Sequence, residues 1–225
     1  MTSTSPESTP SDARPVQALL IDFGGVLTVP ISTAFRALAA DVGLEPDRAL
    51  GVLATHEGAR RALVEHEVGR LDDEGFEDAF AAALVEAGGR VEARGLLARL
   101  AAHLELDLPM IDLVRRVRAA GTPVALVSNS LGRDCYARVD LEELFDVSVV
   151  SGQVGVRKPS REIYRIACDR LGVDPDECVL VDDLEHNLAG SARLGIRGIH
   201  HRTAEDTIPR VHEALSLPAP SGVTT

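Results

Sequence analysis

The stretch ALLIDFGGVLT, residues 18–28, places four apolar residues before a single carboxylate, Asp22, and two glycines, Gly24 and Gly25. A short apolar run bounded by turn residues is typical of a strand that is buried on both faces of a parallel sheet. Glycines directly after such a strand permit a tight turn. The stretch therefore predicts a buried strand that ends in a carboxylate.

Similar apolar runs recur along the chain, separated by helical patterns. Strands are expected at residues 17–21, 123–127, 147–150 and 178–181, with a weaker fifth within residues 195–201. Intervening segments with a helical pattern end in glycine, which is common directly after a helix. These segments are residues 109–121, 160–172 and 185–195. Because strands and helices alternate, the sequence predicts an α/β fold with a mostly parallel sheet.

One interval is too long for a simple crossover between parallel strands. Such a crossover needs only about 10 to 15 residues of helix, yet residues 30–104 hold several helical patterns and no convincing strand. We interpret them as a helical insertion over the carboxyl ends of the strands, where α/β proteins bind ligands. The core is then expected at residues 16–29 and 105–215, and residues 1–15 and 216–225 as a disordered leader and tail.

The bulk composition argues against several classes of partner. The 225 residues are 45% hydrophobic but only 3% aromatic, and they carry a net charge of −12. This charge repels nucleic acids and anionic membranes, and few aromatic rings are present to stack on bases, so neither partner is expected. Three cysteines without a C-x-x-C pair fit reduced thiols in the cytoplasm. We expect a monomer or homodimer that acts on a small molecule.

Polar residues follow several of the expected strands. They are Asp22, Ser128, Asn129, Lys158, Asp182 and Asp183. Each alone has an ordinary explanation as a turn residue, a helix cap or a solvated surface charge. Together they would converge on one edge of the sheet, because the carboxyl ends of neighbouring parallel strands meet there. The sequence thus predicts a site that combines carboxylates, a hydroxyl, an amide and one ammonium group.

Four segments in this order resemble the motifs of the haloacid dehalogenase superfamily: IDFGGVLT, ALVSNS, VGVRKPSREIYR and VLVDDLEHNLAGSARLGI. The resemblance covers about residues 17–201 and is most specific in the last two segments. It implies a Rossmann-like parallel sheet sandwiched by helices, with a helical cap inserted after the first strand. The layout is similar to that of sugar-phosphate phosphatases and of the phosphatase domain of soluble epoxide hydrolases. It implies a hydrolase that acts on a small phosphorylated metabolite.

The resemblance also assigns roles to individual residues. Asp22 would attack phosphorus to form an aspartyl phosphate, and Ser128 and Lys158 would be catalytic beside it. The phosphate would be bound by Gly24, Gly25 and Asn129. The repulsion between a carboxylate and a phosphate at ~4 Å is about 4 kcal/mol per charge pair at an effective dielectric constant near 20. A nearby cation is therefore required.

Magnesium is the cation that the resemblance implies. Mg²⁺ prefers hard oxygen ligands and retains some of its waters. Its ligands would come from Asp22, the main-chain carbonyl of Gly24, Asp182 and Asp183. Lys158 would supply a second, compact positive charge to Asp22 and to the phosphate.

The sequence departs from the resemblance at Gly24. Phosphatases of this superfamily usually carry a second Asp there, which protonates the leaving oxygen, and such help is typically worth 10² to 10⁴ in rate. Either a good leaving group needs no acid, or another residue supplies the proton, or turnover has been lost and the chain is a phosphate-binding pseudoenzyme. Candidate donors are His56, Glu57, His66, Glu185 and His186. A dehalogenase or phosphonatase-type hydrolase is a further alternative, but Asp183 favours a metal-dependent reaction.

Overall fold

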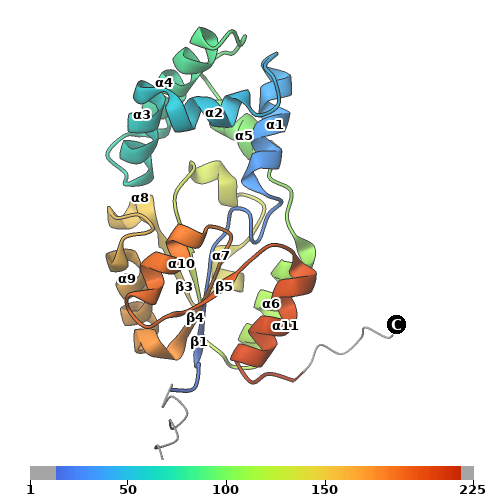
Figure 1. The fold of residues 1–225 in the computed structure, drawn as a ribbon, viewed down its shortest axis with the longest axis vertical. Coiled ribbons are helices and arrows are strands. Elements are labelled where there is room, and N and C mark those ends of the chain that lie inside the picture. The colour runs from blue at the N-terminus through green and yellow to red at the C-terminus, as the bar shows by residue number, and fades with distance from the viewer. Residues whose placement is uncertain (1–13, 219–225) are drawn as a thin grey trace, which may run out of the picture.

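Five short strands form one parallel sheet in the order β3-β2-β1-β4-β5 (Figure 1). The computed structural model describes residues 14–218. The strands are β1 (Ala18–Ile21), β2 (Val124–Ser128), β3 (Val147–Val150), β4 (Cys178–Asp182) and β5 (Arg197–His200). β1 therefore lies in the middle of the sheet, between β2 and β4, and all its residues are buried.

Helices cover both faces of the sheet. The helices α9 (Arg161–Leu171) and α10 (Glu185–Ala192) cover one face, and α6 (Leu108–Ala119) and α11 (Ala204–Ala214) cover the other (Figure 1). Side chains that alternate along β1 belong to different cores, Leu19 with α6 and α11 and Leu20 with α9. This two-sided burial explains why the strands are continuous apolar runs.

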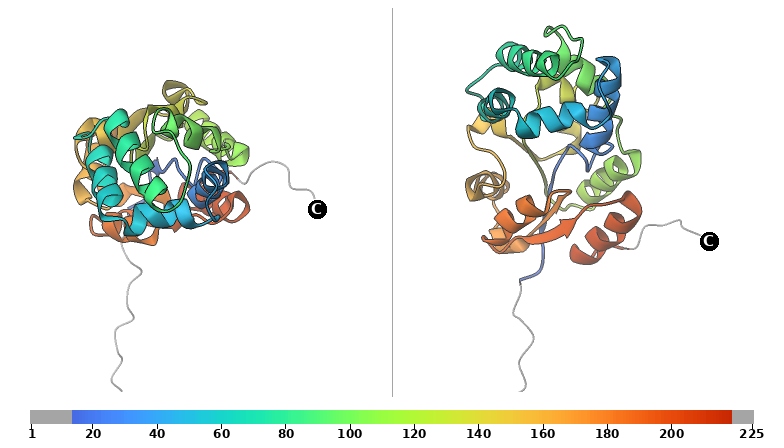
Figure 2. Two further views of the ribbon diagram at one scale, coloured as in Figure 1. Left: turned by 90° about the horizontal axis from the view of Figure 1, so that it is seen from above. Right: turned by 45° about the horizontal axis from the view of Figure 1, so that its top comes forward.

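A layer of helices follows β1 and lies over the carboxyl ends of the strands (Figures 1 and 2). Its members are α1 (Ile31–Asp41), α2 (Arg48–Thr55), α3 (Glu57–Glu67), α4 (Asp73–Glu86) and α5 (Leu96–Ala102). This layer has an apolar core of its own, in which Phe35, Phe76 and Phe80 pack together. The chain breaks between α2 and α3 at His56, whose ring accepts the N–H of Ala59 and caps α3.

The chain leaves the sheet and returns to it along two adjacent segments. Thr28 and Leu106 form an antiparallel bridge, the N–H of Val29 donates to the carbonyl of Glu105 at 2.8 Å, and the N–H of Asp107 donates to Leu27 at 2.9 Å. The helical layer is thus joined to the sheet by a paired connection close to the expected limits of the insertion.

The predicted α/β class with a parallel sheet flanked by helices is confirmed. The sequence analysis did not predict α11 or the short helices η1 (Arg133–Tyr136), α7 (Leu141–Leu144), α8 (Ser151–Val154) and η2 (Pro175–Glu177). Most of the expected leader and tail lies outside the described residues. Between residues 14 and 218, the helices are all too short or too polar to cross a membrane.

Candidate active site

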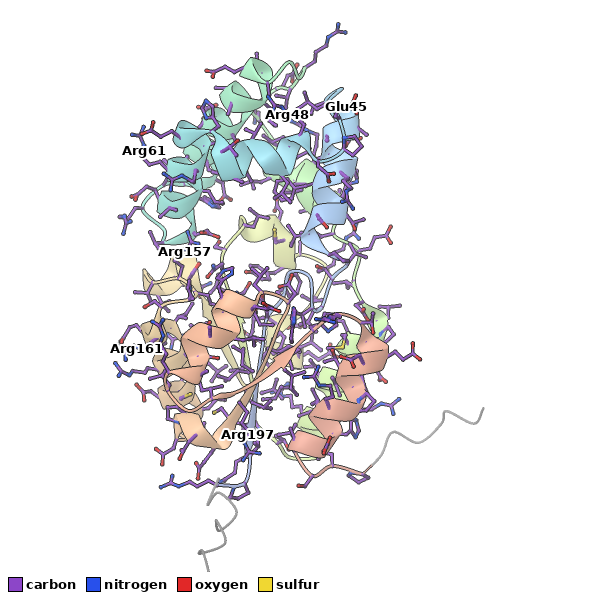
Figure 3. The ribbon with its side chains drawn as sticks, in the orientation of Figure 1. Glu45, Arg48, Arg61, Arg157, Arg161 and Arg197 are labelled. Atoms are coloured by element: carbon purple, nitrogen blue, oxygen red, sulfur yellow. The ribbon has the colours of Figure 1, made fainter. Side chains whose placement is uncertain are left out.

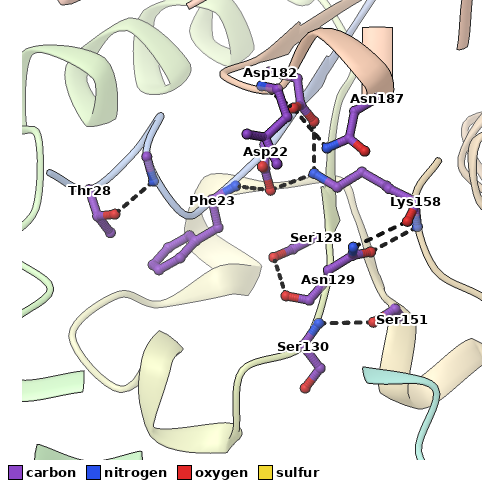
Figure 4. Close-up of polar contacts among 12 residues, drawn as sticks. Asp22, Phe23, Thr28, Ser128, Asn129, Ser130, Ser151, Lys158, Asp182 and Asn187 are labelled. Atoms are coloured by element: carbon purple, nitrogen blue, oxygen red, sulfur yellow. Dashed lines mark hydrogen bonds and ion pairs between the residues drawn. The ribbon is translucent and has the colours of Figure 1, made fainter. Parts of the chain in front are cut away.

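Lys158 joins two buried carboxylates at the carboxyl edge of the sheet (Figure 4). Its Nζ lies 2.7 Å from Oδ1 of Asp22 and 2.8 Å from Oδ2 of Asp182. The side chains of Lys158 and Asp182 are 1% and 0% exposed, and that of Asp22 is 9% exposed. An ammonium group this deeply buried is tolerated because two carboxylates neutralise it.

The strand register brings these groups together. Ile21 of β1 pairs with Val181 of β4, so the residues that follow them, Asp22 and Asp182, emerge side by side. Lys158 lies in the loop after α8 and is held there by Asn129, which follows β2. The side-chain oxygen of Asn129 accepts the N–H of Lys158 at 2.8 Å, and its NH₂ group donates to the carbonyl of Lys158 at 3.3 Å.

Three carboxylates form a cluster that could hold a cation. Oxygen atoms of Asp22, Asp182 and Asp183 all lie within 4.8 Å of one another. Both oxygens of Asp182 are already engaged, one by Lys158 and the other by the N–H of Leu184 and the side chain of Asn187, each at 2.9 Å. In contrast, Oδ1 of Asp183 is buried and has no hydrogen-bond partner among the described residues. This donor set of hard oxygens fits Mg²⁺.

Gly25 is required for the placement of Asp183. Its φ is +78°, which disfavours other residues, and a β-carbon at this position would lie 2.6 Å from Oδ2 of Asp183. The N–H of Gly25 donates to Oγ1 of Thr28 at 3.0 Å (Figure 4). The second glycine after β1 therefore shapes the turn and leaves space for an acidic side chain.

The electrostatics of the cluster call for additional positive charge. Burial raises the pKa of Asp22 to about 7, against the opposing effect of Lys158, and the neighbouring Asp182 and Asp183 add to the rise. Burial and then Asp182 also raise the pKa of Asp183. Burial opposes the charged form of Lys158, but Asp22 and Asp182 outweigh it, so the pKa of Lys158 is raised. With all four groups ionised, one positive charge faces three negative ones.

Gly24 has a neighbour that the sequence did not reveal. A β-carbon on Gly24 would lie 2.8 Å from Cδ1 of Ile31, the first residue of α1. Ile31 therefore occupies the space beside position 24 where an acidic side chain would begin. Glycine at position 24 fits this packing, whereas a larger side chain would require Ile31 to move.

Ser128, at the end of β2, lies on the same edge but is engaged. Its Oγ accepts a hydrogen bond from the hydroxyl of Tyr136 at 2.9 Å. It also lies 3.3 Å from the carbonyl of Asn129, to which it donates (Figure 4). The ring of Tyr136 packs against Phe23 with centroids 4.9 Å apart. A ligand that accepts a hydrogen bond from Ser128 would thus find a hydroxyl oriented by Tyr136.

A cavity of about 570 Å³ lies between the sheet edge and the helical layer. The sheet side contributes all the predicted site residues except Gly25 and Asp182, namely Asp22, Gly24, Ser128, Asn129, Lys158 and Asp183. The helical layer contributes mainly apolar side chains, together with Ser32 of α1 and the carboxyl of Glu67, the last residue of α3. The volume of the cavity is typical of a site for a small molecule.

The five candidate proton donors do not line this cavity. His56 lies 3.1 Å from Glu86, and His66 stacks on Phe76 and lies 2.8 Å from Asp73. Glu57, Glu185 and His186 are exposed on the surface.

The residues that the sequence analysis missed are Glu67, Tyr136 and Asn187. The sequence carries no local signal for Glu67 or Tyr136, because tertiary packing brings them to the site.

This site lies at the carboxyl ends of the strands of a parallel α/β domain, where proteins of this class bind their ligands. Residues 16–195 match the family described as haloacid dehalogenase-like hydrolase. The chain belongs to this family.

Individual relatives match the chain over different lengths. Bifunctional epoxide hydrolase 2 of Mus musculus is 28% identical over 199 residues, which are 81% of this chain and 36% of that protein. Phosphoserine phosphatase of Thermus thermophilus is 29% identical over 131 residues, 55% of this chain and 53% of that protein. The chain thus spans about a third to a half of the lengths of these relatives.

Solved structures share the fold. An enzyme of the same family from Bacteroides thetaiotaomicron superposes with a TM-score of 0.69 over 86% of this chain and 97% of that chain, at 21% identity. The same enzyme has also been solved in complex with magnesium and inorganic phosphate, with a TM-score of 0.61 at 22% identity. At this level of identity, the likeness concerns the fold.

Proposed function

We propose that this chain is a magnesium-dependent phosphatase that hydrolyses a small phosphorylated metabolite through an aspartyl phosphate on Asp22. The observation that carries the proposal is the acidic cluster of Asp22, Asp182 and Asp183, which have oxygens within 4.8 Å of one another, while the ammonium group of Lys158 contacts Asp22 and Asp182 and not Asp183. A divalent cation would balance this charge, and a bound phosphate would add to the need for one.

Asp22 acts as the nucleophile in this proposal. One of its oxygens accepts the N–H of Phe23 at 2.7 Å and the ammonium group of Lys158. Among residues 14–218 no hydrogen bond reaches its other oxygen, which can attack phosphorus. Lys158 holds the carboxylate and offers positive charge to the transferring phosphoryl group. Ser128 would donate to a phosphate oxygen once the ligand is present.

Asp22, Asp183 and the main-chain carbonyl of Gly24 would hold Mg²⁺. When bound, the ion would neutralise the cluster and stabilise the charge on the phosphoryl oxygens. Asp182 has both oxygens engaged, so we assign it to positioning Lys158 and shaping the charge of the site. Two similar proteins are compatible with a magnesium-dependent phosphatase. The enzyme from Bacteroides thetaiotaomicron was solved with magnesium and inorganic phosphate, and the Thermus thermophilus protein is named a phosphoserine phosphatase.

The proposal includes a small-molecule partner and a cytoplasmic location. The nearest pair of thiols, Cys168 and Cys178, have sulfur atoms 3.7 Å apart and remain free. Support for the cytoplasmic location comes from the sequence, which has three cysteines and no C-x-x-C pair.

The experiment is a screen of phosphorylated metabolites with purified protein, in Mg²⁺ and in EDTA. Phosphate release that requires Mg²⁺ and is lost in Asp22→Asn supports the proposal. Full activity in Asp22→Asn removes Asp22 from the mechanism. Halide release from 2-haloacids is measured in parallel, because the family is named after that reaction.

A second candidate is a phosphate-binding protein without turnover. The observation that favours it is Ile31, which fills the space beside Gly24. Such a protein would bind Mg²⁺ and inorganic phosphate in calorimetry, yet would release no phosphate from any member of the panel.

A further inference from the structure

The upper walls of the cavity consist mainly of apolar side chains from the helical layer. Ile31 and Phe35 come from α1, Leu50 and Leu53 from α2, and Leu63 from α3. They face the polar floor formed by the sheet edge. A ligand whose phosphate lies on that floor would place its organic part against these walls.

Two polar groups within the walls, Tyr136 and Cys135, are already occupied. The hydroxyl of Tyr136 donates to Ser128, and Sγ of Cys135 lies 2.7 Å from the carbonyl of Leu131, to which it donates. Burial raises the pKa of Cys135 to about 12, so its thiol stays neutral. These two groups therefore offer little to the hydroxyls of a sugar, and Ser32 of α1 is the one neutral polar side chain that the described helical layer adds to the lining.

The basic residues of the helical layer lie outside the cavity. Arg60 and Arg61 on α3 are exposed, and Figure 3 shows Arg61 on the outer side of that helix. Among the described residues of this layer, Glu67 is the single ionisable group in the cavity wall. A second phosphate or a carboxylate on the ligand would find no basic partner on this side.

On the basis of the proposed phosphatase activity, we propose that the substrate is the phosphate monoester of an uncharged, mainly aliphatic or aromatic alcohol. Apart from one contact with Ser32, sugar and nucleotide hydroxyls buried against these walls would lose hydrogen bonds to water without replacement. Each methylene group that the walls bury should instead improve binding about fourfold.

The test uses a homologous series and does not depend on turnover. Calorimetry in Mg²⁺ measures binding of ethyl-, butyl- and hexylphosphonate, which cannot be hydrolysed. We expect affinity to rise about fourfold per methylene until the cavity is filled. Equal affinities along the series overturn the inference.

Turnover gives the second arm. Hexyl phosphate and glucose 6-phosphate are both esters of primary alcohols, so we expect kcat/KM to favour hexyl phosphate at least tenfold. Equal or better turnover of glucose 6-phosphate overturns the substrate class and leaves the phosphatase proposal intact. If binding instead rises with chain length but neither ester is hydrolysed, the apolar ligand class is supported and the phosphatase proposal is contradicted.

Substitutions of wall residues test whether the walls cause the rise in affinity with chain length. Leu50→Gln and Leu63→Gln should each reduce the gain between ethyl- and hexylphosphonate. Leu108→Gln is the control, because Leu108 is 68% exposed at the start of α6. The same gain in all three variants places the alkyl chain elsewhere.

A second, independent observation concerns the missing proton donor. Glu67 lines the same cavity as Asp22, and its side chain is 12% exposed. Its Oε2 lies 2.7 Å from Nη1 of Arg157 but receives no aligned hydrogen bond among the described residues. Ser151 of α8 donates to its main-chain carbonyl, which fixes the end of α3 against the sheet layer. Figure 3 shows Arg157 at this junction.

We infer that Glu67 is the general acid that replaces an acidic residue at position 24. Its carboxyl group would give a proton to the leaving oxygen as the P–O bond to the alcohol breaks and the bond from phosphorus to Asp22 forms. The resulting carboxylate would then accept a proton from the water that attacks phosphorus, which releases phosphate and restores both carboxyl groups. Burial raises the pKa of Glu67 to about 7, against Arg157 and Lys158, so both forms are accessible at neutral pH.

Leaving-group dependence tests this role. Glu67→Gln should lower kcat for hexyl phosphate by about 10² or more, and kcat for 4-nitrophenyl phosphate, a good leaving group, less than tenfold. The wild-type rate on hexyl phosphate should fall above pH 7, and this limb should vanish in the variant. Glu65→Gln, on the same helix beside Arg70, is the control. Equal losses on both esters, no loss, or a wild-type protein inactive on both, overturn the assignment.

Discussion

Cδ1 of Ile31 lies 2.8 Å from the position that a β-carbon on Gly24 would take. An Asp introduced at residue 24 must displace this methyl group, which is the far end of a half-buried side chain that lines the cavity, so the shift should cost no more than about 1 kcal/mol, the low end for overpacking. Gly24→Asp should therefore lower the free energy of unfolding by that amount, and Gly24→Asp with Ile31→Ala should recover part of it. Urea unfolding of both variants measures the effect.

The same pair of variants separates a working enzyme from a protein without turnover. If Glu67 already supplies the proton, an added Asp at residue 24 should change kcat on hexyl phosphate less than tenfold. A gain of about 10² or more in the double variant, as expected when a missing general acid is restored, would argue that the natural chain is an impaired enzyme.

Lys158 should be essential for stability as well as for activity. Its replacement by Met leaves Asp22 and Asp182 buried without their cation, and breaking a buried pair in this way typically costs about 3 to 5 kcal/mol. The control is Arg116→Met, which removes an exposed ion pair with Asp112 and should cost less than about 1 kcal/mol. Similar losses in the two variants, measured by urea unfolding in EDTA, would count against a buried charge network.

Magnesium should stabilise the protein through Asp183. A ligand at 100 times its Kd adds about 2.7 kcal/mol, which corresponds to a rise in Tm of about 5 to 10 °C for a chain of this size. Asp183→Asn should lose this rise, and Gly25→Ala should reduce it because the new methyl group collides with Asp183. Asp78→Asn, an exposed acid on α4, is the control and should keep it. Persistence of the full rise in Asp183→Asn would place the ion elsewhere.

The raised pKa of Glu67 should appear in the pH dependence of stability. The folded state binds this proton more tightly than the unfolded chain, so the contribution is present below the ordinary pKa of 4.5 and is lost as pH rises through about 7. At about 1.4 kcal/mol per unit of pKa shift, this proton contributes about 3 kcal/mol to the free energy of unfolding at low pH. Glu67→Gln should match the wild-type protein near pH 4.5 and exceed its stability by up to that amount above pH 7.

Unfolding curves at several pH values measure this difference. Glu65→Gln should show no comparable change, since Glu65 lies beside Arg70 at the surface. A constant difference between Glu67→Gln and the wild-type protein, or one of opposite sign, would contradict a buried carboxyl with a raised pKa.

The sheet and its polar edge could be predicted because both depend on local patterns. Apolar runs identify β1 and β4, and the register of parallel strands then brings Asp22 and Asp182 together. The cavity walls could not be predicted in this way. The approach of Ile31 to Gly24 and of Glu67 to the site depends on how the helical layer packs on the sheet, and nothing local marks either residue.

A crystal structure with Mg²⁺ and beryllium fluoride, a mimic of a phosphoryl group on a carboxylate, tests the central proposal most directly. We predict beryllium bound to an oxygen of Asp22, with a magnesium ion contacting Asp22 and Asp183 and the hydroxyl of Ser128 donating to fluoride. Beryllium fluoride absent from Asp22, or bound there with no cation beside Asp183, would contradict the proposal.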